Sequence, residues 1–230
     1  MSQLSTKVST PSASAPSKRE RRKESRPGEL LAAALDLFVE KGFAATRVEE
    51  VAQRAGVSKG TLFLYFASKE ELFKAVVREN ISGHYPGWHE ALQNFEDSTA
   101  EMLHLCAQGW WDNIGCSKAC GIGKLMLAEG GNFPDLQRFY ESEVIEPGNL
   151  LLLRIFERGV ARGEFRADLN LHHLVHLFVS AFLYLMICKL NGLAHGPAQQ
   201  LDPKAFLATQ VDVFLGGIAA GKALEKEDVK

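Results

Sequence analysis

The stretch of sequence that decides the fold is Ala55-Gly56-Val57-Ser58-Lys59-Gly60-Thr61-Leu62-Phe63-Leu64-Tyr65-Phe66. A helix is expected to end at Gly56, because only a residue without a Cβ atom reaches a positive φ at low cost. Ser58 is a candidate N-cap for a second, short helix, whose first turn offers free backbone N–H groups to a phosphate. Two helices joined by a turn that contains glycine make a helix-turn-helix, whose second helix can enter the major groove of DNA.

The short helix is expected to have an inner and an outer face. Leu62 and Phe66 are one helical turn apart, so they can pack inward together. The outer positions are then Lys59, Thr61, Phe63 and Tyr65. The alternative is that Phe63 and Tyr65 are core aromatics, but their position opposite Leu62 and Phe66 favours exposure.

Two capping-box patterns flank this turn. Thr46 and Glu49 have the spacing of a capping box and predict a helix that runs to about residue 54. Ser68 and Glu71 repeat the pattern and open a longer helix with an apolar face. Together with an earlier helix over residues 27–41, these elements predict a compact N-terminal head.

The helix over residues 27–41 carries apolar residues at three- and four-residue spacing and is followed by Gly42, a candidate cap. Pro27 suits its first turn, where a missing N–H costs nothing. Residues 1–25 are rich in Ser, Pro, Lys and Arg and are expected to be disordered. This basic tail can be an arm that follows DNA, or a solvated tail whose charge Glu20 and Glu24 dilute.

The charge is distributed unevenly along the 230 residues. The net charge is −2, yet residues 1–80 hold 14 Lys and Arg against 10 Asp and Glu, and residues 81–230 hold 12 against 18. Because nucleic acid attracts basic surface, any such contact is expected in the first third of the chain. The hydrophobic fraction of 46% is enough for a real core.

The remainder of the chain also has helical periodicity, so the predicted fold class is all-α. Breaks are expected at residues 115–123, at residues 129–131 and near Pro147. The two most apolar helices are expected over residues 171–187 and 203–220. The first is interrupted by polar residues and falls short of a bilayer span, so we expect burial on two sides rather than a membrane.

No cofactor and no metal are expected. Cys116 and Cys120 form one close pair without a second, and His172 and His176 lack a nearby carboxylate or thiol to complete a metal site. The N-terminus lacks the apolar segment of a secretory leader, which favours the cytoplasm. An enzyme, or a helical small-molecule-binding protein without a DNA function, is the alternative class. No phosphate loop or nucleophile motif supports an enzyme. A binding protein without a DNA function would leave residues 1–80 unexplained.

Residues 30–78 resemble the DNA-binding domain of the TetR family of bacterial repressors. The shared positions are Leu31, Ala34, Leu35, Leu37, Phe38, Lys41, Gly42, Thr46, Val51, Ala52, Ala55, Gly56, Val57, Ser58, Gly60, Thr61, Leu62, Tyr65, Phe66, Ser68, Lys69, Glu70 and Leu72. The resemblance implies a homodimer that binds a palindromic operator and is released by a small-molecule effector. It also implies that the last two long helices of each subunit form a four-helix bundle.

The resemblance implies four segments and a set of DNA contacts. The segments are a disordered basic tail (1–25), a helix-turn-helix domain (26–72), a ligand-binding and dimerisation domain (73–222) and a flexible tail (223–230). Thr46 or Arg47 would contact a phosphate at the start of the second helix. Residues that would face the groove or set its approach are Ser58, Lys59, Gly60, Thr61 and Phe63, and those that would hold the far backbone are Tyr65 and Lys69. The family often has tyrosine at Phe63, so one hydroxyl contact is lost here.

Candidates for lining an effector pocket are the large apolar or aromatic residues of the C-terminal region and one histidine. They are His104, Trp110, Trp111, Met126, Phe133, Phe178 and Phe182. A pocket of this kind is mostly apolar with few polar groups. The alternative for each of them is a place in the core or in the dimer interface.

Overall fold

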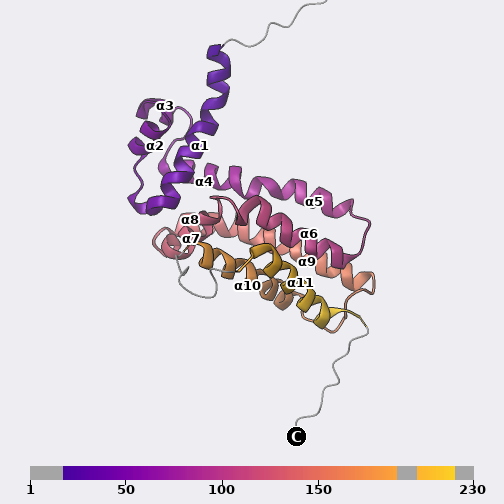
Figure 1. Cartoon of the computed structure of the whole chain (residues 1–230). Helices are drawn as coiled ribbons and strands as arrows, with labels where there is room; N and C mark the ends of the chain where they lie inside the picture. The colour runs from indigo at the N-terminus through magenta and orange to yellow at the C-terminus, as the bar shows by residue number, and fades with distance from the viewer. Residues whose placement is uncertain (1–17, 191–200, 221–230) are drawn as a thin grey trace, which may run out of the picture.

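A computed structural model describes residues 18–190 and 201–220 of the chain, and the fold is all-α in these ranges, as predicted (Figure 1). The single departure within them is an isolated antiparallel bridge between Phe165 and Ala219. The predicted tails over residues 1–17 and 223–230 lie outside the described residues.

The head consists of four helices that pack around three phenylalanines. The helices are α1 (Lys18–Ala45), α2 (Val48–Arg54), α3 (Lys59–Phe63) and α4 (Lys69–Asn80). Phe38, Phe43 and Phe73 lie 5.2–5.7 Å apart between ring centroids and are fully buried. Edge-to-face pairs of this kind stabilise a core beyond the area that they bury.

The start of α1 differs from the prediction. The helix begins at Lys18, so residues 18–25, which were expected to be disordered, are helical, and Pro27 lies inside the helix instead of in its first turn. Lys, Arg and Glu are good helix formers, and this outweighs the one backbone hydrogen bond that Pro27 removes. Gly42, the predicted cap, has φ of 85° and kinks the helix, which is assigned as far as Ala45.

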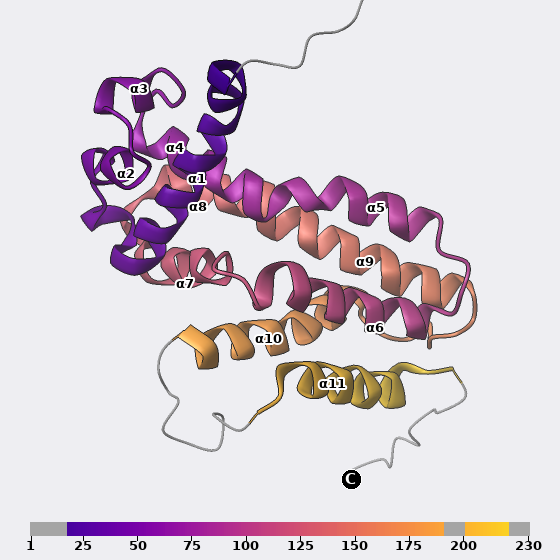
Figure 2. The same ribbon diagram turned by 45° about the horizontal axis from the view of Figure 1, so that its top comes forward.

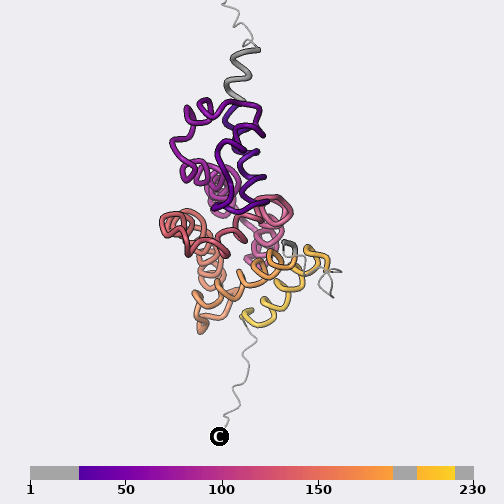
Figure 3. The backbone as a smooth tube through the Cα atoms, turned by 90° about the vertical axis from the view of Figure 1, so that its left-hand side faces the viewer, coloured from indigo at the N-terminus to yellow at the C-terminus, as the bar shows by residue number. Residues whose placement is uncertain are grey.

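The C-terminal domain is a layered helical bundle below the head (Figures 2 and 3). Its helices are α5 (Tyr85–Gln93), α6 (Thr99–Trp110), α7 (Cys120–Glu129), α8 (Pro134–Tyr140), α9 (Glu146–Ala161), α10 (Leu171–Leu190) and α11 (Pro203–Ile218), with 3-10 turns η1 (Ser82–His84) and η3 (Gly130–Asn132) between them. In Figure 2, α5 and α9 lie above α6, α10 lies below it, and α11 is outermost.

Two π-helical turns interrupt this bundle. They are η2 (Trp111–Gly115), which follows α6, and η4 (Glu141–Ile145), which joins α8 to α9. The first lies just before the predicted break at 115–123, and the second lies just before Pro147, which falls in the first turn of α9. Single π turns inside helices are frequent at functional sites.

The core crosses the domain boundary that was predicted at residues 72 and 73. One buried cluster joins the head phenylalanines to Ile122 and Leu125 of α7 and to Leu136 of α8. A second cluster lies between α6, α9, α10 and α11. The head is therefore packed directly on the C-terminal domain, and a displacement of α7 or α8 acts on it through close-packed side chains.

α10 is long and apolar enough to cross a membrane by length and composition alone, a test that the core helix of a soluble protein also passes. One side of α10 is buried against α7, α9 and α11, through residues such as Val175, Phe178 and Leu185. The other side leaves large apolar side chains exposed, including Leu177 and Tyr184. The expected burial on one side is present, and the expected burial of the other side against a partner stays a prediction.

Candidate functional site

The helix-turn-helix has the predicted turn and cap. Gly56 has φ of 65°, in the region that favours glycine, and ends α2. The Ser58 hydroxyl oxygen accepts a hydrogen bond from the backbone N–H of Thr61 at 3.1 Å and lies 2.9 Å from the Thr61 hydroxyl. Ser58 is thus the N-cap of α3, and its own hydroxyl is held within the turn.

The outer face of α3 is more apolar than expected. Phe63 is 40% exposed, as predicted, while Leu64 is 83% exposed. Sequence reasoning missed Leu64, although it lies about 200° around the helix from the buried Leu62, which is a sufficient signal. Tyr65 is half-buried and packs against the head core, so the prediction from the sequence overestimated its exposure.

Acidic side chains pair with the cations of this face. The Lys59 ammonium lies 2.6 Å from Glu49, and the Lys41 ammonium lies 2.9 Å from Glu50. The hydrogen bond from Lys59 lowers the pKa of Glu49, and that from Lys41 lowers the pKa of Glu50. Both carboxylates are therefore ionised at neutral pH. A phosphate that approaches Lys59 has to compete with Glu49.

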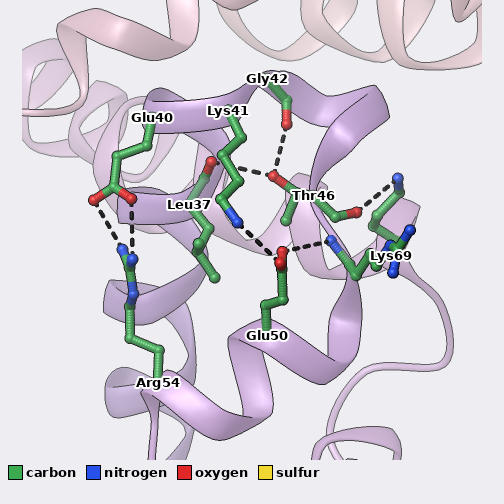
Figure 4. A network of polar contacts seen from close by, with 9 residues as sticks. Leu37, Glu40, Lys41, Gly42, Thr46, Glu50, Arg54 and Lys69 are labelled. Atoms are coloured by element: carbon green, nitrogen blue, oxygen red, sulfur yellow. Dashed lines mark hydrogen bonds and ion pairs between the residues drawn. The ribbon is translucent and has the colours of Figure 1, made fainter.

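The prediction that Thr46 caps α2 is wrong (Figure 4). Its side chain is buried, and its hydroxyl donates toward the carbonyl oxygens of Leu37 at 3.1 Å and Gly42 at 2.6 Å. The cap of α2 is Arg47, whose N–H donates to Glu50 at 3.4 Å. A hydroxyl that closes the kink of α1 cannot reach a phosphate, which leaves the exposed Arg47 as the candidate contact.

Lys69 also has a different place from the predicted one. Its ammonium donates to the carbonyl oxygens of Phe43, Ala44 and Thr46 at 2.8, 3.3 and 3.1 Å, and lies 4.4 Å from the Phe43 ring centroid. An ammonium has three protons, and all three have acceptors here. Lys69 thus stabilises the end of α1 as a cation near a helix C-terminus, which corrects its assignment to the DNA backbone.

We expect Thr46→Val to lower the free energy of unfolding by about 1–3 kcal/mol, because two buried carbonyl groups lose a donor while the side-chain shape is kept. Urea unfolding followed by circular dichroism measures this. Thr209→Val is the matched control, since the Thr209 hydroxyl donates to Ala205 on an exposed helix surface, and its effect is expected to stay within about 0.5 kcal/mol. Equal effects of the two changes would contradict the role given to Thr46.

The C-terminal domain contains a cavity of about 410 Å³ between α5, α6, α7, α9 and α10, a volume typical of small-molecule sites. Three predicted residues line it: Trp110, Met126 and Phe182. Trp110 stacks on Phe182 with ring centroids 4.4 Å apart and planes at 8°. The two π turns border the cavity, since Ile114 of η2 and Val144 of η4 both line it.

Four predicted pocket residues lie elsewhere. His104 faces Asp212 of α11 at 3.3 Å, and Phe178 is fully buried among core phenylalanines. Phe133 stacks edge-on against Phe43 of the head at 4.8 Å, and Trp111 packs against the second core cluster. Trp111 begins the π turn η2 and packs toward the core, whereas Trp110, the last residue of α6, faces the cavity.

Sequence reasoning missed most of the polar and aromatic residues that line the pocket, which are Tyr85, Trp88, Cys106, Cys120, Gln137, Tyr140 and Asn149. The Tyr85 hydroxyl donates to the Val144 carbonyl oxygen at 2.8 Å. Burial raises the pKa of Tyr140 and of Cys106 to about 12 and raises that of Tyr85 further. These groups are therefore neutral at physiological pH.

α7 contacts both the pocket and the head. Its residues Cys120, Gly123 and Met126 line the cavity. At its end, the Glu129 carboxylate accepts a hydrogen bond from the backbone N–H of Ala44 in α1 at 2.9 Å. Gly121 approaches α1 so closely that an added Cβ would lie 2.5 Å from Val39. One helix therefore forms a wall of the pocket and a support of the head.

Metal ligands are not grouped in the part of the chain that the structure describes. Within residues 18–190 and 201–220, no set of three or more His, Cys, Asp or Glu side chains is placed to hold a metal ion. All four cysteines are free thiols, and Cys116 is exposed whereas Cys120 is buried.

The head matches a known sequence family. The family model described as bacterial regulatory proteins, tetR family, matches residues 30–76. RutR of Escherichia coli K12, an HTH-type transcriptional regulator, is 48% identical over 88 residues, which are 38% of this chain and 40% of RutR. The chain thus spans about two fifths of the length of that relative.

Longer similarities exist. KstR2 of Rhodococcus jostii RHA1, an HTH-type transcriptional repressor, is 30% identical over 149 residues, which cover 64% of this chain and 72% of KstR2. The crystal structure of the transcriptional regulator FadR from Bacillus subtilis, in complex with stearoyl-CoA, superimposes with a TM-score of 0.69 at 20% identity, over 83% of this chain and 98% of FadR. At that identity the likeness concerns the fold.

Proposed function

Because the chain belongs to the TetR family of bacterial regulatory proteins, we propose that it is a ligand-responsive transcriptional repressor that binds a palindromic operator as a homodimer. An effector in the C-terminal cavity stabilises a conformer whose two heads no longer match successive major grooves. The observation that carries this proposal is α7, which lines the cavity and holds the head through Glu129 and Gly121. Effector and operator then oppose each other, since linkage between binding sites is reciprocal.

The proposed DNA contacts lie at the start of α2 and along α3. Arg47 is exposed at the N-terminus of α2 and suits a phosphate. The remaining proposed contacts are Ser58, Lys59, Gly60, Thr61, Phe63 and Tyr65, to which we add Leu64 because it is exposed. Phe63 and Leu64 offer apolar contact, which suits thymine methyl groups in the major groove.

The proposed dimer forms through α10 and α11. Large apolar side chains remain exposed on these two helices, with Leu177 at 58% and Val213 at 72%, and exposed apolar patches mark interaction sites. Two copies of this helix pair would make a four-helix bundle. The half-sites of the operator are then separated by about one turn of DNA, roughly 34 Å, or by a multiple of it.

The proposed effector is a small molecule, since the cavity has the volume and apolar lining of such sites. FadR of Bacillus subtilis, crystallised with stearoyl-CoA, is a relative in fold that holds a ligand. A cytoplasmic regulator without enzymatic activity is consistent with its relatives, which are transcriptional regulators. If the protein were a helical carrier without a DNA function, the Ser58 cap and the exposed apolar face of α3 would have no functional explanation.

The test of the DNA-binding half is a pair of substitutions with opposite expected signs. Lys59→Ala should weaken operator binding by about 5–30-fold and reduce the slope of log affinity against log salt by about one unit, because one phosphate contact is lost. Glu49→Gln removes the competing partner of Lys59 and should tighten binding at low salt by a few-fold. Fluorescence anisotropy with DNA from upstream of the protein's own gene measures both.

Arg138→Ala is the control, because Arg138 pairs with Asp135 on α8, away from the head's outer face. It should leave both operator affinity and salt slope unchanged. Operator binding by Lys59→Ala with the parental affinity and slope would refute the proposed contact. Binding to no upstream DNA at any salt concentration would refute the function itself.

A further inference from the structure

We propose that the cavity takes an uncharged, largely apolar molecule with one hydrogen-bonding oxygen, of the alcohol or ketone class, and excludes free carboxylates, ammonium groups and phosphate-bearing thioesters. This inference rests on the proposed function, because it names the class of effector that the repressor would detect. It follows from the composition of the cavity wall, from its polar and apolar parts and from the helix termini around it.

The cavity wall carries no formal charge. None of the described residues that line it is Asp, Glu, Lys, Arg or His. Its ionisable members Tyr85, Tyr140 and Cys106 are neutral, because burial raises the pKa of each. A charged group that leaves water without a partner pays a large desolvation free energy. The part of a ligand that contacts this wall is thus favoured in its neutral form.

One end of the cavity is polar. Tyr85 of α5, Tyr140 of α8 and Cys120 of α7 all line the cavity, and the Tyr140 hydroxyl would lie 3.5 Å from a Cβ at Gly123 of α7. The Tyr85 hydroxyl is anchored on the Val144 carbonyl of the π turn η4 and would lie 3.1 Å from a Cβ at Gly148. These neutral hydroxyl groups can exchange a hydrogen bond with an alcohol or donate one to a ketone.

The remainder of the cavity is aromatic and aliphatic. The stacked pair of Trp110 and Phe182 forms one wall, and side chains of α5, α6, α9 and α10 complete it, including Leu92, Phe95, Leu105, Leu152, Ile155 and Val179. This apolar lining accepts a hydrocarbon or aromatic body, and each buried methylene group raises the affinity about fourfold.

The N-termini of α7 and α9 do not supply an anion site at the polar end. α9 continues from α8 through η4, so it has no free first turn, and the N–H of Glu146 donates to the Glu141 carbonyl oxygen. At the start of α7, the N–H groups of Gly121 and Ile122 donate to the carbonyl oxygens of Lys118 and Ala119 at 2.9 Å. A carboxylate would therefore lack the free N–H groups that anions use.

The test compares probes of equal chain length on the full-length protein: 1-decanol, 2-decanone, decanoate and decyltrimethylammonium. The intrinsic fluorescence of Trp88 and Trp110, which both line the cavity, reports binding. At neutral pH we expect the alcohol and the ketone to bind at least about 30-fold more tightly than either ion, since the ions leave an unpaired charge in the cavity. Decanoate should bind more tightly as the pH falls toward its own pKa, because its neutral form becomes populated.

Tyr140→Phe separates the hydrogen bond from the apolar contact. It should weaken decanol and decanone binding by about 5–10-fold and leave the binding of 1-chlorodecane, which has no oxygen, unchanged. Ser142→Ala is the control and should change none of these affinities, because the Ser142 hydroxyl donates to the Phe139 carbonyl oxygen and does not line the cavity. The pH dependence of decanoate binding requires no substitution, so it remains decisive if Tyr140→Phe fails to fold.

Decanoate binding as tight as that of decanol, or independent of pH, would overturn the inference, as would the absence of binding by both neutral probes. Operator release is measured separately, by anisotropy with the same probes. Binding in the expected order without release would refute the effector role and leave the ligand class standing. Release by the charged probes alone would refute the ligand class and leave the repressor standing.

Discussion

Val213→Asp is expected to convert the protein to a monomer and to lower its operator affinity by more than about 100-fold. Val213 is 72% exposed on α11, the outermost helix of the bundle. In the proposed dimer it is buried between two copies of the α10 and α11 pair, where a carboxylate would lose its hydration without gaining a partner. Loss of the dimer removes the advantage of two linked heads on one operator, which is worth two or more orders of magnitude.

Leu150→Asp provides the matched control. Leu150 is also a large exposed apolar residue, but it lies on α9, away from the proposed interface, and it does not line the cavity. Light scattering after size-exclusion chromatography should show a dimer for Leu150→Asp and a monomer for Val213→Asp. Only Leu150→Asp should keep the parental operator affinity. A dimeric Val213→Asp that binds the operator normally would exclude α11 from the interface.

Gly159→Ala is expected to lower the free energy of unfolding by about 3 kcal/mol, at the upper end of the usual cost of overpacking. A Cβ at Gly159 would lie 2.0 Å from the ring of Phe165, which is buried and faces Phe156. The ring cannot move alone, because the following N–H of Arg166 donates to the Ile218 carbonyl oxygen at 2.9 Å. The strain therefore extends to the end of α11.

Gly87→Ala separates this steric effect from helix propensity. Gly87 lies in α5, is exposed, and would place a Cβ in open space. Alanine should stabilise the helix by up to about 1 kcal/mol, because glycine loses more backbone entropy on folding. Thermal unfolding of both variants measures these two effects on stability. A Gly159→Ala protein as stable as the parent would contradict the close packing of Phe165.

Local patterns predicted the helices and most of their ends. The caps by Ser58 and Ser68 were each predicted from the sequence, and each serine oxygen accepts a hydrogen bond from the N–H three residues later. The positive φ of Gly56 is likewise as expected. Such features depend on a few neighbouring residues, so a single sequence contains the information that determines them.

Side chains that act across the fold could not be assigned in this way. The ammonium of Lys69 reaches carbonyls more than 20 residues earlier, and Phe133 packs on Phe43 of the head. In both cases the residue type could be read from the sequence but its partner could not, because the partner depends on how α1, α4 and α8 pack against one another. The lining of the cavity could not be predicted for the same reason, since Tyr85 and Tyr140 come to one cavity only through tertiary packing.

The double role of α7 also limits how this protein can acquire a new specificity. Cys120, Gly123 and Met126 face the cavity, but on the same helix Gly121 has no room for a side chain against Val39, and Glu129 holds the backbone of α1. A change of α7 that suits another compound would also shift the unliganded equilibrium of the heads. Descendants of this sensor, natural or engineered, are therefore expected to change their ligand through α5, α9 and α10 and to leave α7 as it is.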